Sequence, residues 1–336
     1  MTQGASASPI ARASASDIAY GYGYAKPLVP ALAAPPVHPK PTSRSTPKPL
    51  HPNRGPQQPL HSLHHSRTPK SHEATHPQHP HPHHSERVHH QQPGIPAMML
   101  LDHAVLDMRA AGANPKLLAY MNQSQNLVST PLGTLRPLAN TTRIQVFNSY
   151  AGIAQAIANH TIAGNTRAVV YDNERFTGTP ADELRDPVRY CNMTAKLLHR
   201  NGLKYIASPG FDLSGRRPTN GEWFRQFVGA GLMKCAQDAD YLDVQDQLIQ
   251  GTATYARDAQ EAATLLHQIN PRAKLLMGLS TSPSGRLDTA GQLWRAYQDT
   301  SRFASGYWLN VPRNVSGHSR PVVALQFLQH VVTRIP

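Results

Sequence analysis

From residue 97 onward, short runs of aliphatic residues alternate with longer stretches in which apolar residues recur every three to four positions. The short runs predict buried strands, and the longer stretches predict amphipathic helices. The predicted strands are residues 116–121, 143–147, 167–172, 203–208, 240–245, 273–279 and 306–310. The predicted helices include residues 180–200, 221–237, 252–270 and 289–304, and residues 97–111 hold an eighth strand or a leading helix.

The sequence thus predicts seven strands in about 240 residues, and most of them are followed by a helical stretch. This pattern is typical of an α/β fold, the (β/α)8 barrel of the TIM type. The competing architecture is a doubly wound open sheet. That fold usually carries a glycine-rich phosphate-binding loop after its first strand, and the sequence has no such loop. The pattern therefore favours a barrel domain in residues 97–336.

Residues 1–96 differ in composition from the rest of the chain. They contain 18 of the 30 prolines and 13 of the 19 histidines, and few aliphatic residues. Proline removes backbone donors, and so little apolar surface cannot offset an ordering entropy of about 1–2 kcal/mol per residue. We predict a disordered, Pro/His-rich arm that is partly in the polyproline II conformation.

The histidines of the arm are a candidate metal-binding tract, and four of them, His79, His81, His83 and His84, lie within six residues. Imidazole suits zinc, nickel or copper, so this tract predicts a weak site for a divalent metal. The alternative is a solvated tether whose histidines only titrate, with an unperturbed pKa of about 6.5. For the barrel itself we expect no metal site and no cofactor.

The chain has 33 Lys and Arg against 20 Asp and Glu, which gives a net charge of +13. The basic residues are scattered and no nucleic-acid-binding module is present, so charge alone predicts only non-specific binding. No window reaches the roughly 18 uninterrupted apolar residues of a transmembrane segment. Residues 1–34 lack the apolar core of a signal peptide, about 7–15 residues, so a suspected secreted or cell-surface location has no leader to support it. We expect a monomer.

The two cysteines, Cys191 and Cys235, exclude a disulfide scaffold and a cysteine-based zinc cluster. Both fall in predicted helices on the outside of the barrel. A disulfide requires Cα atoms within about 7 Å of each other. Because of this demand, two buried free thiols are favoured, and a single bridge is the alternative.

The candidate chemistry lies at the C-terminal ends of the strands, where (β/α)8 barrels place their active sites. Side chains alternate across a strand, so Asp172 and Glu174 share one face, and Asp243 and Gln245 share another. Both faces should point into the barrel. The other predicted members of this polar ring are Ser208, Asp212, Ser280, Trp308 and Asn310.

Buried carboxylates cost several kcal/mol unless they are paired or hydrogen-bonded. In one explanation, Asp172, Glu174 and Asp243 satisfy loop amides and nearby arginines such as Arg175 or Arg216. In the other, they perform general acid/base chemistry, with a carboxyl pKa raised by burial and by a neighbouring like charge. Other carboxylates fall on predicted helices and should be solvated: Asp182, Glu183, Asp186, Asp258 and Glu261.

Five segments resemble those of uncharacterised bacterial proteins: VVYDNE (169–174), YIASPGFDL (205–213), YLDVQDQ (241–247), GLSTSPSG (278–285) and GYWLN (306–310). The resemblance covers about residues 140–315 and implies a barrel of glycoside-hydrolase-like appearance. Asp172-x-Glu174 is also similar to the end of the chitinase motif Asp-x-x-Asp-x-Asp-x-Glu. In that motif the Glu is the acid and its Asp neighbour orients the substrate, but the two earlier acidic positions are Arg167 and Val170 here.

We therefore expect a glycoside-hydrolase-like barrel that acts on, or binds, carbohydrate polymers or other polyhydroxylated ligands. Glu174 is the candidate general acid, Asp172 its partner and Asp243 the second carboxylate. Trp308 is either a stacking platform for a sugar ring or a core tryptophan, and the candidate hydrogen-bonding groups are Gln245, Ser208, Asp212, Ser280 and Asn310. The alternative is a non-catalytic glycan-binding or surface protein with a metal-binding or pH-responsive arm. The residues favour a hydrolase and leave the alternative open.

Overall fold

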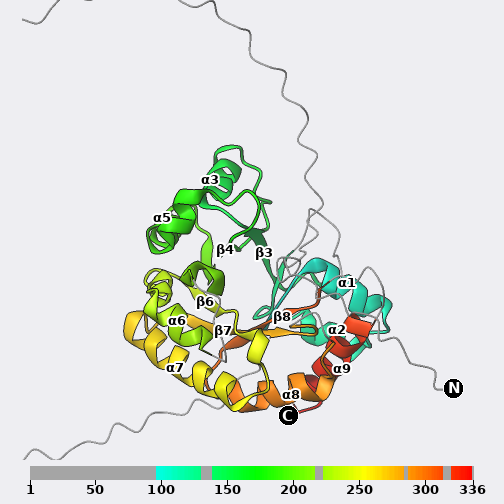
Figure 1. Cartoon of the computed structure of the whole chain (residues 1–336). Coiled ribbons are helices and arrows are strands. Elements are labelled where there is room, and N and C mark those ends of the chain that lie inside the picture. The colour runs from blue at the N-terminus through cyan, green and yellow to red at the C-terminus, as the bar shows by residue number, and fades with distance from the viewer. Residues whose placement is uncertain (1–95, 130–137, 216–221, 284–286, 313–318, 335–336) are drawn as a thin grey trace, which may run out of the picture. The chain divides into compact units, whose positions relative to one another are not determined.

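The structure, a computed structural model, describes residues 96–129, 138–215, 222–283, 287–312 and 319–334. Eight parallel strands form a closed barrel in which each strand pairs with the next along the chain and the last pairs with the first (Figure 1). The strands are β1 (Ala97–Leu100), β2 (Leu127–Ser129), β3 (Thr142–Phe147), β4 (Ala168–Asn173), β5 (Lys204–Pro209), β6 (Tyr241–Val244), β7 (Lys274–Ser280) and β8 (Gly306–Asn310). The predicted TIM-type (β/α)8 barrel is confirmed, while the predicted arm and its histidines lie outside the described residues.

Helices surround the strands on the outside of the barrel (Figure 1). The α-helices are α1 (Asp102–Ala110), α2 (Pro115–Met121), α3 (Tyr150–Ala158), α4 (Ala181–Arg185), α5 (Pro187–Arg200), α6 (Trp223–Gly229), α7 (Ala253–Ile269), α8 (Ala290–Thr300) and α9 (Ser319–Thr333). Short 3-10 helices are η2 (Phe211–Ser214), η3 (Leu232–Ala236) and η4 (Gln247–Ile249). Five helices begin after a capping side chain that accepts a hydrogen bond from the backbone N–H three residues later: Asn114, Ser149, Asp186, Thr252 and Thr289.

Two apolar layers stabilise the barrel, one on each side of the strands. On β4, Ala168 and Val170 join a cluster inside the barrel, whereas Val169 and Tyr171 pack among the helices. The inner cluster also contains Met99, Leu127, Ile144, Ile206, Tyr241, Leu276 and Trp308. Successive residues of a strand therefore belong to different layers. The prediction that Asp172 and Asp243 point into the barrel depends on this alternation.

The predicted strand at residues 116–121 is wrong, because this segment is helix α2. The side chain of Asn114 caps it, Pro115 occupies its first turn, and its buried residues are spaced for a helical face: Leu117, Tyr120 and Met121. Residues 97–111 hold both of the predicted alternatives, since β1 runs directly into α1. The second strand is β2, which has only three residues and no pattern of its own.

The prediction that Glu183 and Asp258 are solvated is also wrong. Glu183 is 1% exposed and accepts hydrogen bonds from the backbone N–H groups of Tyr150 and Ala151 and from the Tyr171 hydroxyl. Asp258 is 2% exposed and pairs with the neighbouring Arg257 at 2.9 Å. The other three helical carboxylates are exposed, as predicted: Asp182, Asp186 and Glu261.

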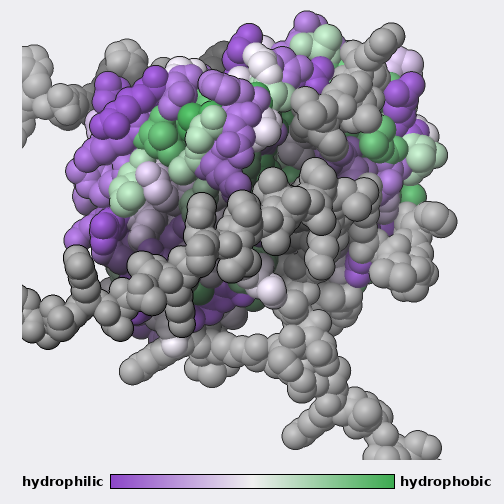
Figure 2. Space-filling view, turned by 90° about the horizontal axis from the view of Figure 1, so that it is seen from above, coloured by the Kyte–Doolittle hydropathy of each residue, from purple (hydrophilic) through white to green (hydrophobic). Residues whose placement is uncertain are grey.

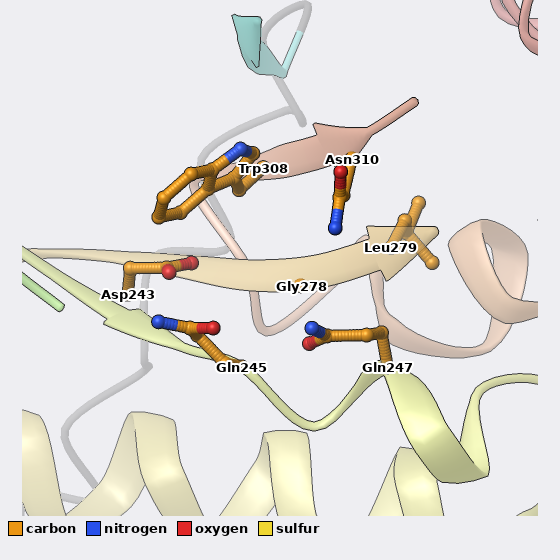
Figure 3. Close-up of a pocket in the computed structure, with 7 residues that line it drawn as sticks. All are labelled: Asp243, Gln245, Gln247, Gly278, Leu279, Trp308 and Asn310. Carbon is orange, nitrogen blue, oxygen red and sulfur yellow. The ribbon is translucent and has the colours of Figure 1, made fainter. Parts of the chain in front are cut away.

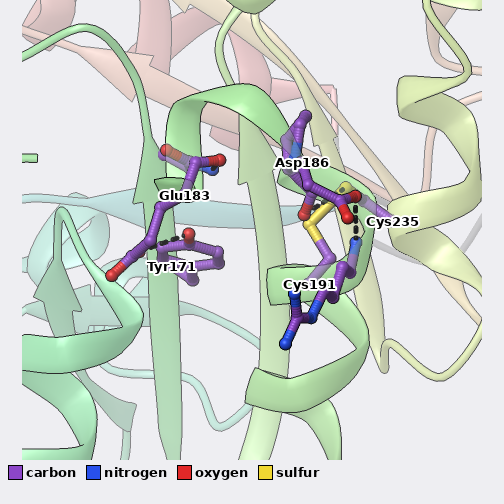
Figure 4. The surroundings of a disulfide bond; sticks show 8 residues. Tyr171, Glu183, Asp186, Cys191 and Cys235 are labelled. Atoms are coloured by element: carbon purple, nitrogen blue, oxygen red, sulfur yellow. Dashed lines mark hydrogen bonds between the residues drawn. A yellow bond between two sulfur atoms is a disulfide. The ribbon is translucent and has the colours of Figure 1, made fainter. Parts of the chain in front are cut away.

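Cys191 and Cys235 form a disulfide bond, with Cα atoms 5.1 Å apart (Figure 4). The favoured prediction of two free thiols is therefore wrong. The reason is that α5 and η3 pack against each other on the outside of the barrel, which meets the distance requirement of a disulfide. The bridge joins the helix that follows β4 to the short helix that precedes β6, and these two strands carry the predicted carboxylates.

The surface seen in Figure 2 is mostly hydrophilic, with small separate hydrophobic areas. Among the described residues, the exposed large hydrophobic side chains are far apart in the sequence: Leu106 of α1, Leu287 between β7 and α8, and Val322 of α9. Within the same described ranges, none of the helices is long and apolar enough to cross a membrane.

Candidate functional site

Asp172 and Asp243 meet at one hydroxyl group at the C-terminal end of the barrel. Ser208 donates to Asp243 Oδ2 at 2.9 Å, and its Oγ lies 3.5 Å from Asp172 Oδ1. Gln245 donates from Nε2 to Asp172 Oδ1 at 3.0 Å and to Ser208 Oγ at 2.9 Å. The two carboxylate oxygens are therefore no further apart than about 7 Å, since both lie within 3.5 Å of the same atom.

Strand register explains why these side chains meet. Asp172 of β4 is level with Ser208 of β5. Ile206 is level with Tyr241 of β6, so Ser208 and Asp243, two residues further along each strand, are neighbours on the same inward face. The apolar inner cluster thus gives way to polar groups at the C-terminal ends of three consecutive strands.

Glu174 follows β4 and packs against the backbone of Gly210. A Cβ atom at Gly210 would lie 2.4 Å from Glu174 Cγ, so a larger residue at this position would displace the Glu174 side chain. The neighbouring Gln245 side chain lowers the pKa of Glu174, in the direction opposite to the effect of burial. Asp212 lies close by and accepts a hydrogen bond from the Arg175 backbone N–H at 2.7 Å.

The structural explanation for the carboxylates named Arg175 and Arg216 as partners. The hydrogen bonds of Arg175 go to Asp212, through its backbone N–H and through Nε to the backbone oxygen at 3.0 Å. Arg216 lies outside the described residues. The described side-chain hydrogen bonds of Asp172 and Asp243 come instead from neutral groups, Ser208 and Gln245.

Burial without a described positive partner raises the pKa of all three carboxyl groups. The pKa of Asp172 rises to about 7, because burial and the charge of Asp212 outweigh the hydrogen bonds from Gln245 and Ser208. Burial, together with the charges of Asp172 and Asp212, raises the pKa of Glu174 well above its usual range. Burial does the same for Asp243. These upward shifts favour the protonated form of a carboxyl group, which is the form that a general acid needs.

A small pocket adjoins this cluster, with an empty volume of about 170 Å³. Side chains from β8 and from β6 with the turn after it converge over Gly278 of β7 (Figure 3). The lining residues are Asp243, Gln245, Gln247, Gly278, Leu279, Trp308 and Asn310. Its enclosed part, about 10 Å³, has room for one group of about the size of a water molecule. A hydroxyl or amino group of a ligand fits there, and the rest of a sugar ring would lie outside it.

The predicted site residues divide into three groups. Asp243, Gln245, Trp308 and Asn310 line the pocket, and the carboxyl cluster beside it contains Asp172, Glu174, Ser208 and Asp212. Ser280 belongs to neither group, because its Oγ accepts a hydrogen bond from the Ser282 backbone N–H at 3.1 Å. Trp308 is 3% exposed and packs in the inner cluster, so it forms part of the pocket wall.

Gln247 and the two glycines were not among the predicted site residues. Gln247 continues the alternation of Asp243 and Gln245, and that pattern is the signal that could have identified it. A Cβ atom at Gly278 would lie 2.5 Å from Gln247 Oε1, which explains why this strand position is a glycine. Gly210 supports Glu174 in the same way. Nothing in the sequence signals these close approaches, because they join separate strands.

The donor set of the site is made of oxygen and amide groups. None of the described residues that line the pocket is a lysine, arginine or histidine. In the part of the chain that the structure describes, no group of three or more His, Cys, Asp or Glu side chains is arranged to hold a metal ion.

Comparisons with known proteins add little to the geometry. No protein-family model and no curated protein matches the sequence. One similar solved structure is a sugar phosphate isomerase/epimerase from Parabacteroides distasonis, which is 10% identical over 72% of this chain and 97% of that chain, with a TM-score of 0.37. A likeness at this level carries no argument about activity, and the barrel fold rests on the observed strand order.

Proposed function

We propose that the chain is a hydrolase of the glycosidase type that cleaves a carbohydrate polymer by carboxyl acid/base chemistry. The observation that carries this proposal is the group of three buried carboxyl groups with raised pKa values, Asp172, Glu174 and Asp243. They lie at the end of the barrel where such folds perform their chemistry. The fold by itself supports no particular reaction.

Glu174 is the general acid in this proposal. Its pKa is raised by burial and by neighbouring carboxylates, which favours the protonated form. That form can transfer its proton to the glycosidic oxygen as the bond breaks. Asp172 supports this role because its charge adds to the upward shift of the Glu174 pKa. Gln245 donates hydrogen bonds to Asp172 and to Ser208 and so holds Asp172 in a fixed orientation.

Asp243 is the second carboxylate. It lines the pocket beside Trp308, and Ser208 holds its Oδ2. When the glycosidic bond breaks, positive charge develops on the sugar ring, and a carboxylate at this place stabilises that charge. Asn310 and Gln247 line the same pocket and are able to hydrogen-bond to sugar hydroxyl groups.

The alternative, a non-catalytic glycan-binding protein, is less well supported. Sugar-binding surfaces need an accessible aromatic face, and Trp308 is only 3% exposed. Buried carboxyl groups with raised pKa values are costly in a protein that only binds sugars, because the folded state then resists their ionisation.

The experiment is a hydrolysis screen of the full chain against neutral, acidic and amino polysaccharides, with release of reducing ends as the measure. Glu174→Gln should remove activity on any substrate that the wild type cleaves. Glu261→Gln, a change of the same kind on the exposed face of α7, is the control and should leave activity unchanged. A wild type that cleaves nothing, or a Glu174→Gln variant with full activity, would contradict the proposal.

We further propose that the protein acts outside the cytoplasm, as a monomer, with the Pro/His-rich arm as a tether. The support for export is the Cys191–Cys235 bridge, since disulfides persist mainly in oxidising compartments. Weak binding of a divalent metal through His79, His81, His83 and His84 stays a prediction.

A further inference from the structure

Two oxygen atoms of the pocket residues are buried acceptors without a hydrogen-bond partner. They are Asp243 Oδ1 and Gln247 Oε1, and their residues are 0% and 4% exposed. Leaving a buried acceptor unpaired destabilises the folded state, because the acceptor has lost its hydrogen bonds to water. Groups of this kind inside a binding pocket are complementary to a ligand that brings hydrogen-bond donors.

Both oxygens are held in place by the fold. Ser208 fixes the other carboxylate oxygen of Asp243 at 2.9 Å. Gln247 lies over Gly278, with Oε1 only 2.5 Å from where a Cβ atom would be. In Figure 3 the Asp243 carboxyl group and the Gln247 amide extend toward each other from two ends of the same segment. Both residues line the same small pocket, and the fold fixes the position of each acceptor.

The charge of the pocket selects among donors. Its described lining contains one carboxyl group, that of Asp243, and no basic side chain. A second carboxyl group, that of Asp172, lies near the first, because both contact the hydroxyl group of Ser208. A negatively charged group, such as a phosphate or a uronate, would find no basic side chain among these lining residues to neutralise it, and it would lie next to a carboxyl group. An ammonium group brings up to three donors and the positive charge that these carboxyl groups lack.

Trp308 strengthens this selection. Its ring forms the pocket wall on the β8 side. Aromatic faces, of which tryptophan is the best, attract a cation through the ring quadrupole. A carboxyl group and an indole ring at one small pocket are thus both favourable to a cationic group.

We propose that this pocket binds the free amino group of an amino sugar, with Asp243 Oδ1 and Gln247 Oε1 as acceptors. This inference rests on the proposed function and names its substrate class as a polymer that contains unacetylated amino sugar units. The net charge of +13 on the whole chain acts in the opposite direction. It favours non-specific binding of anionic polymers, so a preference for a cationic sugar would come from the pocket itself.

The test measures binding by calorimetry with the Glu174→Gln variant of the full chain, in 150 mM salt at pH 6.5. The probes are β-1,4-linked tetramers of glucosamine, of N-acetylglucosamine and of glucose, and the corresponding monosaccharides together with galactosamine and galactose. An amine-bearing probe should bind at least about tenfold more tightly than its acetylated or neutral counterpart, the scale of one charge-assisted hydrogen bond. Equal or weaker binding of all amine-bearing probes would overturn the inference.

Variants assign the preference to the pocket. Asp243→Asn should bring the ratio close to one, and Gln247→Met should lower it. Asp299→Asn, on the exposed face of α8, is the control and should leave it unchanged. If Asp243→Asn does not fold, Gln247→Met decides the assignment, and an unchanged ratio in that variant overturns it.

This test also separates the inference from the proposed function. Preferential amine binding without hydrolysis of any polymer would contradict the enzyme and leave the amino-sugar pocket standing. Hydrolysis restricted to neutral, acidic or fully acetylated polymers would contradict the pocket assignment and leave the acid/base mechanism standing.

Discussion

The substitution Asp172→Asn tests whether this carboxyl group is buried in a protonated form. The folded protein raises the pKa of Asp172 from its ordinary 3.8 to about 7. Between those two pH values the folded chain keeps a proton that the unfolded chain has released. Stability that is present below about pH 4 is therefore lost as the pH rises to about 7.

The magnitude follows from the difference between the two pKa values. At about 1.36 kcal/mol for each pH unit, Asp172 alone costs the folded state on the order of 4 kcal/mol at pH 7.5 relative to pH 4. The asparagine variant does not have this cost. The substitution also removes a charge that raises the pKa of Glu174. The difference in unfolding free energy between variant and wild type should therefore change with pH by at least this amount.

The assay is reversible urea unfolding of the oxidised full chain at several pH values from 4.5 to 7.5. The stability of Asp172→Asn relative to wild type should increase steadily across this range, whereas Asp299→Asn, which changes an exposed carboxylate of α8, should show no such trend. A difference between Asp172→Asn and wild type that stays constant with pH would refute the reasoning. So would a difference that changes in the opposite direction.

Three further predictions concern the supports of the site. Gly210→Ala should lower kcat while the protein stays folded, because the new Cβ atom would lie 2.4 Å from Glu174 Cγ and displace this side chain. The control is Gly291→Ala in α8, where the nearest atom would be 3.8 Å from the new Cβ atom, and kcat in the same assay should not change. Removing the disulfide with Cys191→Ala and Cys235→Ala together should lower the free energy of unfolding by about 2–5 kcal/mol, measured by urea titration; two free thiols in the unreduced protein, seen by mass spectrometry, would contradict the bridge. Glu183→Gln should destabilise the barrel by about 1.5–3 kcal/mol or more, since two backbone N–H groups and the Tyr171 hydroxyl lose a charged acceptor; thermal unfolding within 1 °C of wild type would contradict this role.

The sequence predicts the parts of this molecule that follow local rules. Strict alternation places Asp172 and Glu174 on one face and Asp243 and Gln245 on another, and the structure joins Asp172 and Asp243 through Ser208. Register in a parallel barrel is regular, so residues that end neighbouring strands on the same face come together.

Local sequence rules did not predict the contacts between segments that are far apart in the chain. The local sequence around Glu183 predicts an exposed residue on a polar helix. Its hydrogen-bond partners, at the start of α3, are more than 30 residues away in the sequence. The disulfide depends on the packing of α5 against η3, which no local pattern shows. At residues 116–121 the apolar run suits a strand or a helix equally, and the cap at Asn114 with Pro115 decides for the helix.

The central claim, that Glu174 is a general acid in the barrel mouth, is tested most directly by the effect of the leaving group on Glu174→Gln. The substrates are aryl glycosides of the sugar that the wild type cleaves best, with one phenol of high pKa and one of low pKa. General acid catalysis predicts a loss of kcat of about 10²–10⁴ on the first substrate. It predicts a much smaller loss on the second, whose leaving group departs without protonation. Equal losses on both substrates, or no loss on either, would contradict the claim.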